Sequence, residues 1–363
     1  MKKVLFIINS LGQGGAERVV ANLANEMCKE CEVIILTIYS DLAYTLDAQI
    51  TVHSLNQEKG KAGKLKSLFT VKNTLNKIVA KLEKDKPFDL ITSHLPFAHL
   101  LSKSTYFAHR CYFVVHTVYS REMSLKKAAF LVNLIYKNKR VITVSEGVKD
   151  ELRDIFRVKY ENAYVIPNPV DISLIQEKAK EPLKKDYEFI IGVGRLESNK
   201  RFDLLISSYN QSKAREKFKL VLLGEGSQFE KLYNLCTELG LNDNVVFAGW
   251  QQNPYKWLKN SALSVVTSEF ESLGNTIIES LACGTKAISV DCDYGPREIL
   301  KDDLAKFLIL DQNTKSISKM IDKALNDYPQ IKKDHVKRYG INVITNKYLE
   351  LADNDDASHN SKR

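Results

Sequence analysis

The chain has 363 residues, of which 44% are hydrophobic and 27% charged, and its formal net charge is +9 at pH 7. This length suits two domains of ordinary size, and the composition supplies two apolar cores, which excludes a disordered or fibrous protein. The apolar runs are short and interrupted, and none approaches the roughly 20 residues that span a bilayer.

The first half of the chain alternates short apolar runs with amphipathic segments, which predicts a parallel sheet covered by helices on both faces. The first run follows two lysines but is too short for a signal peptide, so we interpret it as a buried strand. The scattered cysteines, six in all, indicate reduced thiols and a cytoplasmic chain. The expected strands are 4–8, 33–38, 89–92, 112–116, 140–144 and 164–166, and the expected helices are 16–27, 64–82, 125–136 and 146–156.

The same rhythm restarts after a polar stretch at 176–187, so the sequence predicts two doubly wound α/β domains. We expect a first domain at 1–170, a linker at 171–186, a second domain at 187–335, a helix at 336–352 that returns to the first domain, and a disordered tail at 353–363. In the second half, the expected strands are 189–193, 219–223, 245–247, 263–266 and 287–290, and the expected helices are 202–210, 228–239, 271–279, 314–326 and 341–351.

The excess positive charge is confined to the first 140 residues, which carry 21 Lys and Arg against 11 Asp and Glu. It is concentrated in two segments, 61–86 and 121–140, where bases alternate with apolar residues at helical spacing. Such helices are typical of binding to an anionic membrane surface. Ordinary amphipathic helices with solvated basic faces are the alternative, and no nucleic-acid-binding module is visible.

Glycine-rich turns follow the predicted strands, where parallel sheets bind their ligands. The first is Gly12-Gln-Gly-Gly-Ala-Glu17, in which Gly14 and Gly15 would let a ligand approach the backbone. It lacks the third glycine of the dinucleotide fingerprint, because Glu17 stands there, which disfavours a dehydrogenase. Further turns are Gly224-Glu-Gly226 and the segment ending in Gly249 and Trp250, where a base could stack and hydrogen-bond.

Two segments of the second half favour a phosphate ligand. Arg195 and Lys200, in Gly192-Val-Gly-Arg-Leu-Glu-Ser-Asn-Lys200, could hold a diphosphate. Glu271 and Glu279 flank Gly274 and the predicted start of a helix, where free backbone N–H groups suit a phosphate. An anion at this helix end would have a carboxylate on either side, as the sugar and the ribose of a nucleotide sugar require.

Taken in order, these motifs resemble the family 4 glycosyltransferases with the GT-B fold, and the resemblance covers about residues 2–350. The most similar members are bacterial enzymes that build lipopolysaccharide, capsule or lipid-linked glycans. The resemblance implies two Rossmann-like domains facing across a cleft. It also implies transfer of a hexose, with retention of configuration and without a bound metal, from a nucleotide sugar that we expect to carry UDP. The acceptor would be a lipid-linked or cell-surface glycan at the inner face of the membrane.

The resemblance also implies roles for individual residues. Arg195 and Lys200 would neutralise the leaving diphosphate, Glu271 would hold the donor sugar, and Glu279 would hold the ribose. His116, at a strand end, matches a family histidine that contacts the donor sugar, and Gly15 would approach the phosphate from across the cleft. The backbone N–H groups that would bind the diphosphate oxygens belong to Leu273, Gly274, Asn275 and Thr276.

Some features depart from this family or allow another interpretation. Ser272 follows Glu271 where the family often has glycine, and Arg201 follows Lys200, which leaves the sugar specificity open. Asp291-Cys-Asp293 imitates a metal-binding motif, and Cys28 and Cys31 have zinc-like spacing without a second pair. We expect no metal at either place. A nucleotide-sugar epimerase and a non-catalytic nucleotide-sugar-binding subunit are the alternative functions.

Overall fold

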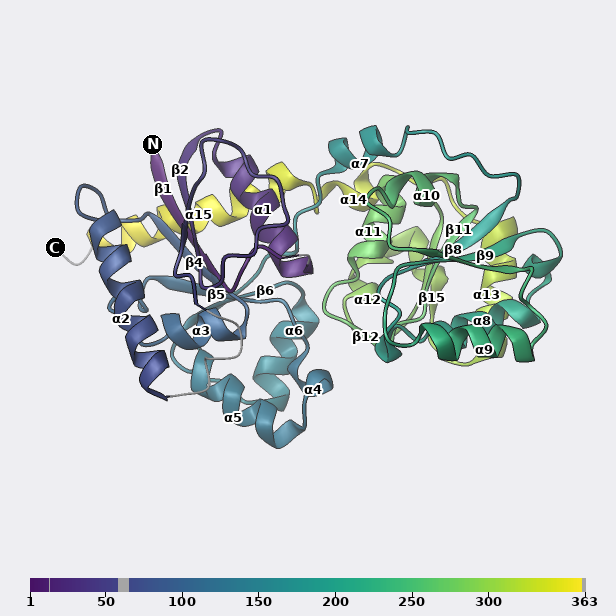
Figure 1. Cartoon of the computed structure of the whole chain (residues 1–363), viewed down its shortest axis with the longest axis horizontal. Helices are drawn as coiled ribbons and strands as arrows, with labels where there is room; N and C mark the ends of the chain where they lie inside the picture. Colours follow the sequence, from purple (N-terminus) through teal and green to yellow (C-terminus); the bar gives the residue numbers. More distant parts are fainter. Residues whose placement is uncertain (13, 58–64, 361–363) are drawn as a thin grey trace. The chain divides into compact units, whose positions relative to one another are not determined.

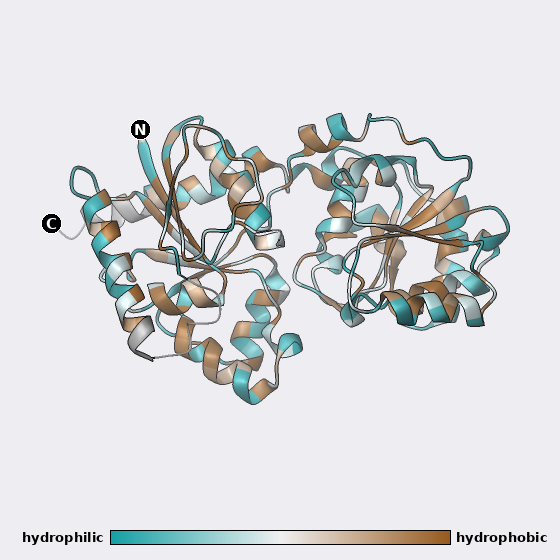
Figure 2. Ribbon diagram, in the orientation of Figure 1, coloured by the Kyte–Doolittle hydropathy of each residue, from teal (hydrophilic) through white to brown (hydrophobic). Residues whose placement is uncertain are grey.

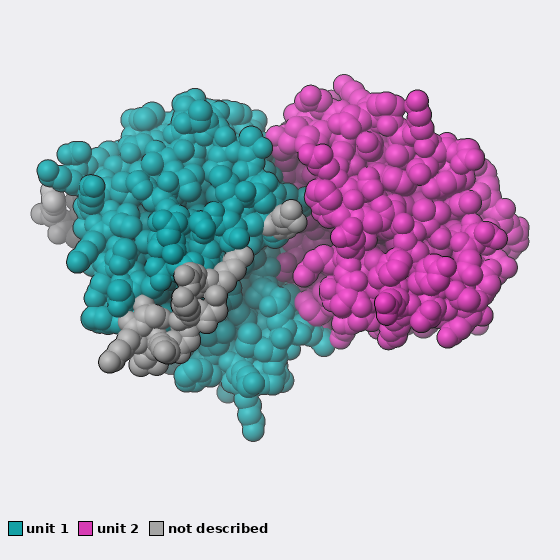
Figure 3. All heavy atoms as spheres, in the orientation of Figure 1, with its two compact units in different colours: residues 1–169, 341–363 teal, residues 170–340 magenta. Residues whose placement is uncertain are grey.

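The computed structural model describes residues 1–12, 14–57 and 65–360, which fold into two compact units (Figures 1 and 3). Unit 1 contains Met1–Pro169 and Ile341–Arg363, and unit 2 contains Val170–Gly340. Each unit has a parallel sheet with helices on both faces, which confirms the predicted fold class of two doubly wound α/β units. Residues 61–64 of the basic segment and 361–363 of the predicted tail lie outside the described residues.

Unit 1 is built on a seven-stranded parallel sheet in the order β3-β2-β1-β4-β5-β6-β7. Its strands are β1 (Lys2–Ile8), β2 (Cys31–Thr37), β3 (Thr51–Ser54), β4 (Leu90–His94), β5 (Cys111–Val115), β6 (Arg140–Thr143) and β7 (Asn162–Val165). Its helices are α1 (Gly15–Met27), α2 (Leu65–Leu82), α3 (Pro96–Ser102), α4 (Tyr119–Glu122), α5 (Leu125–Tyr136), α6 (Glu146–Asp150) and α15 (Ile341–Asn360).

The central strands β1, β4 and β5 of unit 1 are buried almost throughout because helices cover both faces of the sheet, and they are largely hydrophobic in the hydropathy colours (Figure 2). Successive side chains of a strand point to opposite faces. Accordingly, Val4, Phe6 and Ile8 of β1 share one core cluster with residues of α1 and α15. Ile344 and Tyr348 of α15 are almost fully buried in this cluster, so the last helix of the chain is part of the core of unit 1.

Unit 2 is built on a six-stranded parallel sheet in the order β10-β9-β8-β11-β13-β15, beside a two-stranded pair, β12-β14. Its strands are β8 (Phe189–Val193), β9 (Lys219–Leu223), β10 (Val245–Gly249), β11 (Leu263–Val266), β12 (Phe270–Glu271), β13 (Ala287–Val290), β14 (Asp293–Tyr294) and β15 (Leu308–Ile309). Its helices are α7 (Ile172–Lys178), α8 (Phe202–Gln211), α9 (Phe229–Glu238), α10 (Tyr255–Asn260), α11 (Asn275–Ala282), α12 (Pro296–Ile299), α13 (Thr314–Asn326) and α14 (Asp334–Lys337).

Several elements differ from the sequence prediction. The predicted helix 146–156 is divided, because α6 ends at Asp150 and a π-helical turn, Glu151–Ile155, follows it. Helix α7 lies within the segment predicted as a linker. The polar tail from Asp353 continues α15 as far as Asn360 instead of being disordered. The Lys2 ammonium group pairs with Asp353 at 2.6 Å and donates to the Leu349 carbonyl, which ties α15 to β1.

Candidate functional site

Both sheets change winding direction at their centre, and the predicted motifs lie at these points. In unit 1 the change falls between β1 and β4, and in unit 2 between β8 and β11. Ligands of doubly wound sheets bind beyond the carboxyl ends of the strands at this switch point. The segment with Arg195 and Lys200 follows β8, and the segment with Glu271 follows β11. The topology of unit 2 therefore gathers the predicted donor residues at one edge of its sheet.

Lys200 and Glu271 form an ion pair, with 2.6 Å between Nζ and Oε1. Both side chains are largely buried, and the Ser268 hydroxyl donates to the same carboxylate oxygen at 2.7 Å. The pair thus joins the segment after β8 to the segment after β11, and it leaves the second oxygen of Glu271 for another partner. Both residues were predicted to bind the ligand, whereas their contact with each other was not predicted.

Backbone contacts hold these two segments in register. The Thr267 hydroxyl lies 3.0 Å from both the Lys200 and the Arg201 carbonyl oxygens, and the Glu269 N–H donates to the Asn199 carbonyl at 2.8 Å. Arg201 has a left-handed backbone with φ of 50°, which turns the chain from the 3₁₀ turn Ser198–Lys200 into α8. Lys200 is therefore presented from a fixed backbone, which favours preorganised binding of a charged group.

The segment between Glu271 and α11 is shaped by two glycines. Gly274 has φ of 96° and is the N-cap of α11, and as a glycine it has no side chain that could accept from the first N–H groups of the helix. A Cβ added at Gly295 would lie 1.9 Å from the Leu273 carbonyl oxygen. Gly295 therefore supports the 271–274 segment by close backbone packing. Only the packing reveals this role.

The residues predicted to bind the diphosphate and the ribose lie on α11 or just before it. Asn275 and Thr276 are its first two residues, and Leu273, just before it, is 1% exposed. Glu279 lies in the second turn of the helix and is only 7% exposed. A buried carboxylate costs free energy unless polar groups compensate for it; contact of Glu279 with a ribose stays a prediction.

Arg195 is exposed, in contrast to Lys200. Its neighbour Glu197 accepts hydrogen bonds from the Ser227 N–H and hydroxyl, which hold the pKa of that carboxyl below its ordinary value. The exposed guanidinium group of Arg195 lies on the segment that follows β8 and also carries Lys200.

The segment after β10 was predicted to face a base. Gly249 has φ of 67°, and its carbonyl accepts a hydrogen bond from Gly224 N–H at 2.9 Å. The Trp250 side chain is 59% exposed, while its backbone N–H already donates to Glu225 Oε1 at 3.3 Å. An incoming base would therefore compete with the Glu225 carboxylate for this N–H, and base binding at Gly249 and Trp250 stays a prediction.

In the possible metal-binding motif, Asp291-Cys-Asp293, the first aspartate forms an ion pair with Arg297. Arg297 Nε and a terminal guanidinium nitrogen contact the two oxygens of Asp291 at 3.0 and 2.7 Å. Cys28 and Cys31 are buried free thiols, and burial raises the pKa of each. In residues 1–12, 14–57 and 65–360, no group of three His, Cys, Asp or Glu side chains is placed to hold a metal ion.

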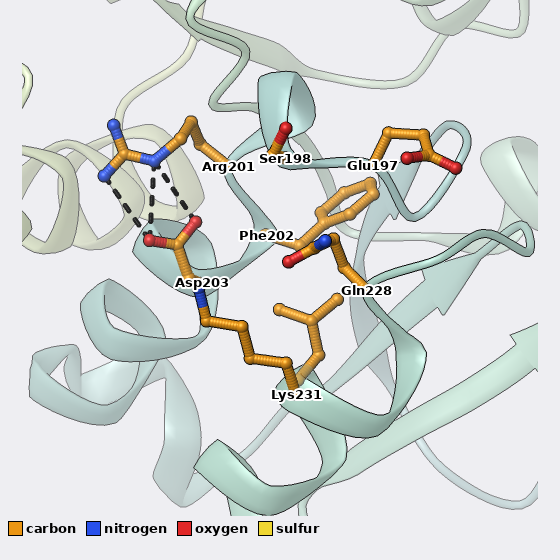
Figure 4. A pocket seen from close by; sticks show the side chains of 8 residues that line it. Glu197, Ser198, Arg201, Phe202, Asp203, Gln228 and Lys231 are labelled. Carbon is orange, nitrogen blue, oxygen red and sulfur yellow. Dashed lines mark hydrogen bonds and ion pairs between the residues drawn. The ribbon is translucent and has the colours of Figure 1, made fainter.

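A separate small pocket opens beside the Ser198–Lys200 turn (Figure 4). Its volume of 110 Å³ is below the roughly 300–1,000 Å³ of small-molecule pockets, so it cannot enclose a nucleotide sugar. Arg201 and Asp203 pair with each other at its rim. Charges of both signs give it no preference for phosphate; the lining residues are Glu197, Ser198, Arg201, Phe202, Asp203, Gln228, Lys231 and Leu232.

In unit 1, His116 follows β5 and belongs to a chain of polar groups. Its Nε2 lies 2.9 Å from His94 Nδ1, and His94 Nε2 lies 3.0 Å from the Thr92 hydroxyl. His116 Nδ1 is buried, and the side chain of Asn168 lies close enough to interact with the ring. Both ring nitrogens of His116 therefore point into the protein. A side-chain contact to a donor sugar would require the ring to turn, so this role stays a prediction.

The Gly-rich turn after β1 lies against an acidic side chain. Gly14 caps α1, its carbonyl accepts the Tyr44 hydroxyl at 2.8 Å, and a Cβ on it would lie 2.1 Å from Glu17 Oε2. Burial raises the pKa of Glu17. Gly15 has open space around its Cα and is exposed. The approach of Gly15 to a phosphate stays a prediction, and residue 13 lies outside the described residues.

The buried histidines of unit 1 predict a loss of stability in mild acid. Burial lowers the pKa of His116 to about 4 and of His99 to about 3, and it holds that of His94 well below its ordinary value. Below about pH 6.5 the unfolded chain binds protons that the folded chain does not, so the free energy of unfolding falls as the pH falls from about 6.5 to 4. Each histidine contributes up to about 1.4 kcal/mol per pH unit.

Urea unfolding at pH 7, 6, 5 and 4 measures how steeply the free energy of unfolding falls as the pH falls. His99 Nε2 donates to the Ser93 carbonyl, so its Nδ1 accepts the Tyr136 hydroxyl. His99→Gln can keep both contacts without a titrating ring and is expected to flatten the slope. His109→Gln, at an exposed site, is the matched control and is expected to retain it. Equal slopes in all three proteins would contradict the assignment.

Two family models together match nearly the whole chain. Residues 13–174 match Glycosyltransferase Family 4, and residues 175–343 match Glycosyl transferases group 1. The two parallel α/β sheets match the GT-B fold, and the chain belongs to the family 4 glycosyltransferases. This result confirms the resemblance inferred from the sequence motifs.

Among its relatives, the chain is 28% identical over 338 residues to the Campylobacter jejuni N-acetylgalactosamine-N,N'-diacetylbacillosaminyl-diphospho-undecaprenol 4-alpha-N-acetylgalactosaminyltransferase, covering 90% of this chain and 91% of that protein. It is 34% identical over 169 residues to the lipopolysaccharide 1,6-galactosyltransferase of Escherichia coli K12, covering 45% of this chain and 46% of that protein. Anabaena HepE in complex with UDP and glucose matches with a TM-score of 0.75 and 20% identity, over 98% of this chain and all of that one.

Proposed function

We propose that the protein transfers a hexose from a UDP-sugar to a lipid-linked or cell-surface glycan, with retention of configuration. The observation that carries the proposal is the ion pair between Lys200 and Glu271. Glu271 lies three residues before Gly274, the N-cap of α11. The ion pair offers a cation for the leaving diphosphate and a carboxylate for the sugar hydroxyls. The Campylobacter jejuni relative, named for N-acetylgalactosaminyl transfer to a diphospho-undecaprenol glycan, makes N-acetylgalactosamine the second candidate sugar.

In this proposal, catalysis depends mainly on stabilising the negative charge that develops on the leaving diphosphate. Lys200, Arg195 and the N-terminal N–H groups of α11 neutralise the diphosphate as the bond to the sugar breaks. Glu271 holds the sugar, and Glu279 holds the ribose. An oxygen of the departing phosphate accepts the proton of the attacking hydroxyl, so the reaction needs no carboxylate pair spanning the bond as in retaining hydrolases. The UDP complexes of HepE support UDP as the carrier.

Transfer assays with UDP-glucose, UDP-galactose, UDP-N-acetylgalactosamine and GDP-mannose, in the presence of lipid-linked glycans, test the proposal. We expect one UDP-sugar to give a product that keeps the anomeric configuration. A thermal-shift panel identifies the carrier, since a ligand at 100 times its Kd adds about 2.7 kcal/mol. Absence of transfer from every UDP- and GDP-sugar would overturn it. Donor turnover without an acceptor would favour the epimerase, and binding without turnover would favour the non-catalytic subunit.

We also propose that unit 1 binds an anionic membrane surface through helix α5. Three of its apolar side chains are exposed, Leu125 by 58%, Phe130 by 72% and Leu134 by 41%. Lys126, Lys127 and Lys137, on or just after α5, are exposed as well. Apolar side chains beside lysines suit an interfacial helix on anionic lipid. No helix in the described part of the chain is long and apolar enough to cross a bilayer.

Liposome flotation measures this binding. The wild-type protein is expected to float with vesicles of phosphatidylglycerol and phosphatidylcholine at low salt and to be released at high salt. Lys126→Glu with Lys127→Glu is expected to weaken binding more than tenfold, at about 1 kcal/mol for each lysine removed. Lys315→Glu with Lys319→Glu, on exposed positions of α13, is the matched control. Equal binding of the two double variants would contradict the assignment to α5.

A further inference from the structure

A pair of aromatic side chains that none of the sequence motifs included lies at the carboxyl edge of the unit 1 sheet, near its switch point. Tyr39 follows β2 and Phe97 lies at the start of α3, which follows β4. Their ring centroids are 6.1 Å apart and the ring planes differ by only 8°. Both residues are partly exposed. Two nearly parallel rings therefore lie beyond the carboxyl ends of two strands, at the edge where such sheets bind ligands.

Asn9, the residue directly after the central strand β1, holds the backbone beside both rings. β1 lies between β2 and β4, with Ile8 in register with Thr37 and His94. Asn9, the next residue, accepts the Tyr39 N–H on its backbone carbonyl at 2.8 Å and the Ala98 N–H on Oδ1 at 2.9 Å. The same residue thus anchors the backbone beside each ring. The two segments that carry the rings are therefore tied to each other through Asn9.

The backbone beside Phe97 is also conformationally unusual. Leu95 has φ of 72° and ψ of 149°, a conformation that residues other than glycine rarely adopt. Pro96 follows it and begins α3, so the turn between β4 and the helix is stiff. Strained residues persist where the surrounding structure holds them, and they cluster at ligand sites. His94, at the end of β4, places this turn next to the chain of polar groups that includes His116.

We propose that Tyr39 and Phe97 form a stacking surface for a pyranose ring of the acceptor glycan. This inference rests on the proposed glycosyl transfer and assigns its acceptor side. The faces of a pyranose ring carry C–H groups, and these pack on the flat faces of aromatic rings, while the hydroxyls at the ring edge stay hydrated. A pair of rigid, parallel rings selects a flat, ring-shaped partner, whereas an acyl chain needs only apolar area.

Saturation-transfer NMR with two soluble sugars tests the surface. Methyl α-D-glucopyranoside and methyl N-acetyl-α-D-galactosaminide carry no lipid chain, and they are added to the full-length protein saturated with UDP. At least one sugar is expected to show saturation of its ring protons. Tyr39→Ala and Phe97→Ala are each expected to weaken its binding about tenfold. Tyr39→Phe, which keeps the ring, is expected to bind as the wild type does.

Matched measurements separate this inference from the proposed function. Tyr233→Ala, an exposed tyrosine on α9 of unit 2, is the control and should leave sugar binding unchanged. Thermal shift with UDP in every variant shows whether the fold and donor binding are intact. Failure of UDP to bind the wild type would count against the proposed function. If UDP binds, the stacking surface is overturned by absence of sugar saturation, by unchanged binding in both alanine variants, or by saturation of octyl phosphate alone.

Discussion

Replacement of Lys200 by alanine is expected to lower kcat by about 10²–10³-fold, the usual effect of removing one group that stabilises charge in the transition state. The loss is large because the ammonium group is held from a fixed backbone and is largely buried beside Glu271. The variant also leaves the Glu271 carboxylate without its cation, which destabilises unit 2. Steady-state kinetics and thermal unfolding measure the two effects separately.

Comparison variants show whether Lys200 acts on the leaving group or only on Glu271. A double-mutant cycle with Glu271→Gln measures the coupling between the two residues. If Lys200 only holds Glu271, the double variant will have the activity of Glu271→Gln alone. Arg195→Ala is expected to lower kcat as well, whereas Glu279→Gln is expected to raise the Kd for UDP. Lys213→Ala, on unit 2 outside the site, is the control. A kcat for Lys200→Ala within twofold of wild type would refute the assignment.

Gly295→Ala is expected to disrupt the donor site although it adds only one methyl group. The new Cβ would lie 1.9 Å from the Leu273 oxygen and 2.3 Å from the Leu273 Cα, and main-chain atoms cannot move aside as a flexible side chain can. The 271–274 segment must therefore shift, at about 1–3 kcal/mol of stability. Because this segment joins Glu271 to α11, UDP is expected to give no thermal shift in the variant.

Gly240→Ala is the control for this experiment. Gly240 also has a left-handed backbone, with φ of 65°, but no atom lies within 4 Å of the added Cβ. It is expected to lose about 1–2 kcal/mol through backbone strain and to bind UDP normally. Normal UDP binding by Gly295→Ala would show that the close contact to Leu273 does not support the donor site.

The local pattern of the chain predicted most elements. The strands at 263–266 and 287–290 and the helices at 125–136 and 314–326 have the predicted bounds, because a buried apolar run or a strong helical period defines each of them. Short elements such as β3, β12 and α10 were not predicted. Strand β12, for instance, exists because Phe270 and Glu271 pair with β14, a contact with no signal in the local sequence.

The candidate site, too, was predicted only where the local sequence carries a signal. Arg195, Lys200, Glu271 and Glu279 could be proposed because charged residues in turns after buried strands indicate a ligand. The contact between Lys200 and Glu271, the close packing at Gly295, and the polar chain from Thr92 through His94 to His116 join residues far apart in sequence. No periodicity or motif specifies such distances.

The sequence by itself determined the family, the two parallel α/β units and the charged residues of the donor site. These depend on local hydrophobic period and on the order of short motifs, which the chain carries directly. Only the tertiary structure decided that Lys200 pairs with Glu271, that both His116 nitrogens point inward, and that Asn9 holds the backbone beside both Tyr39 and Phe97. The physical reason is that hydrogen bonds and close packing depend on which strand ends the sheet order brings together.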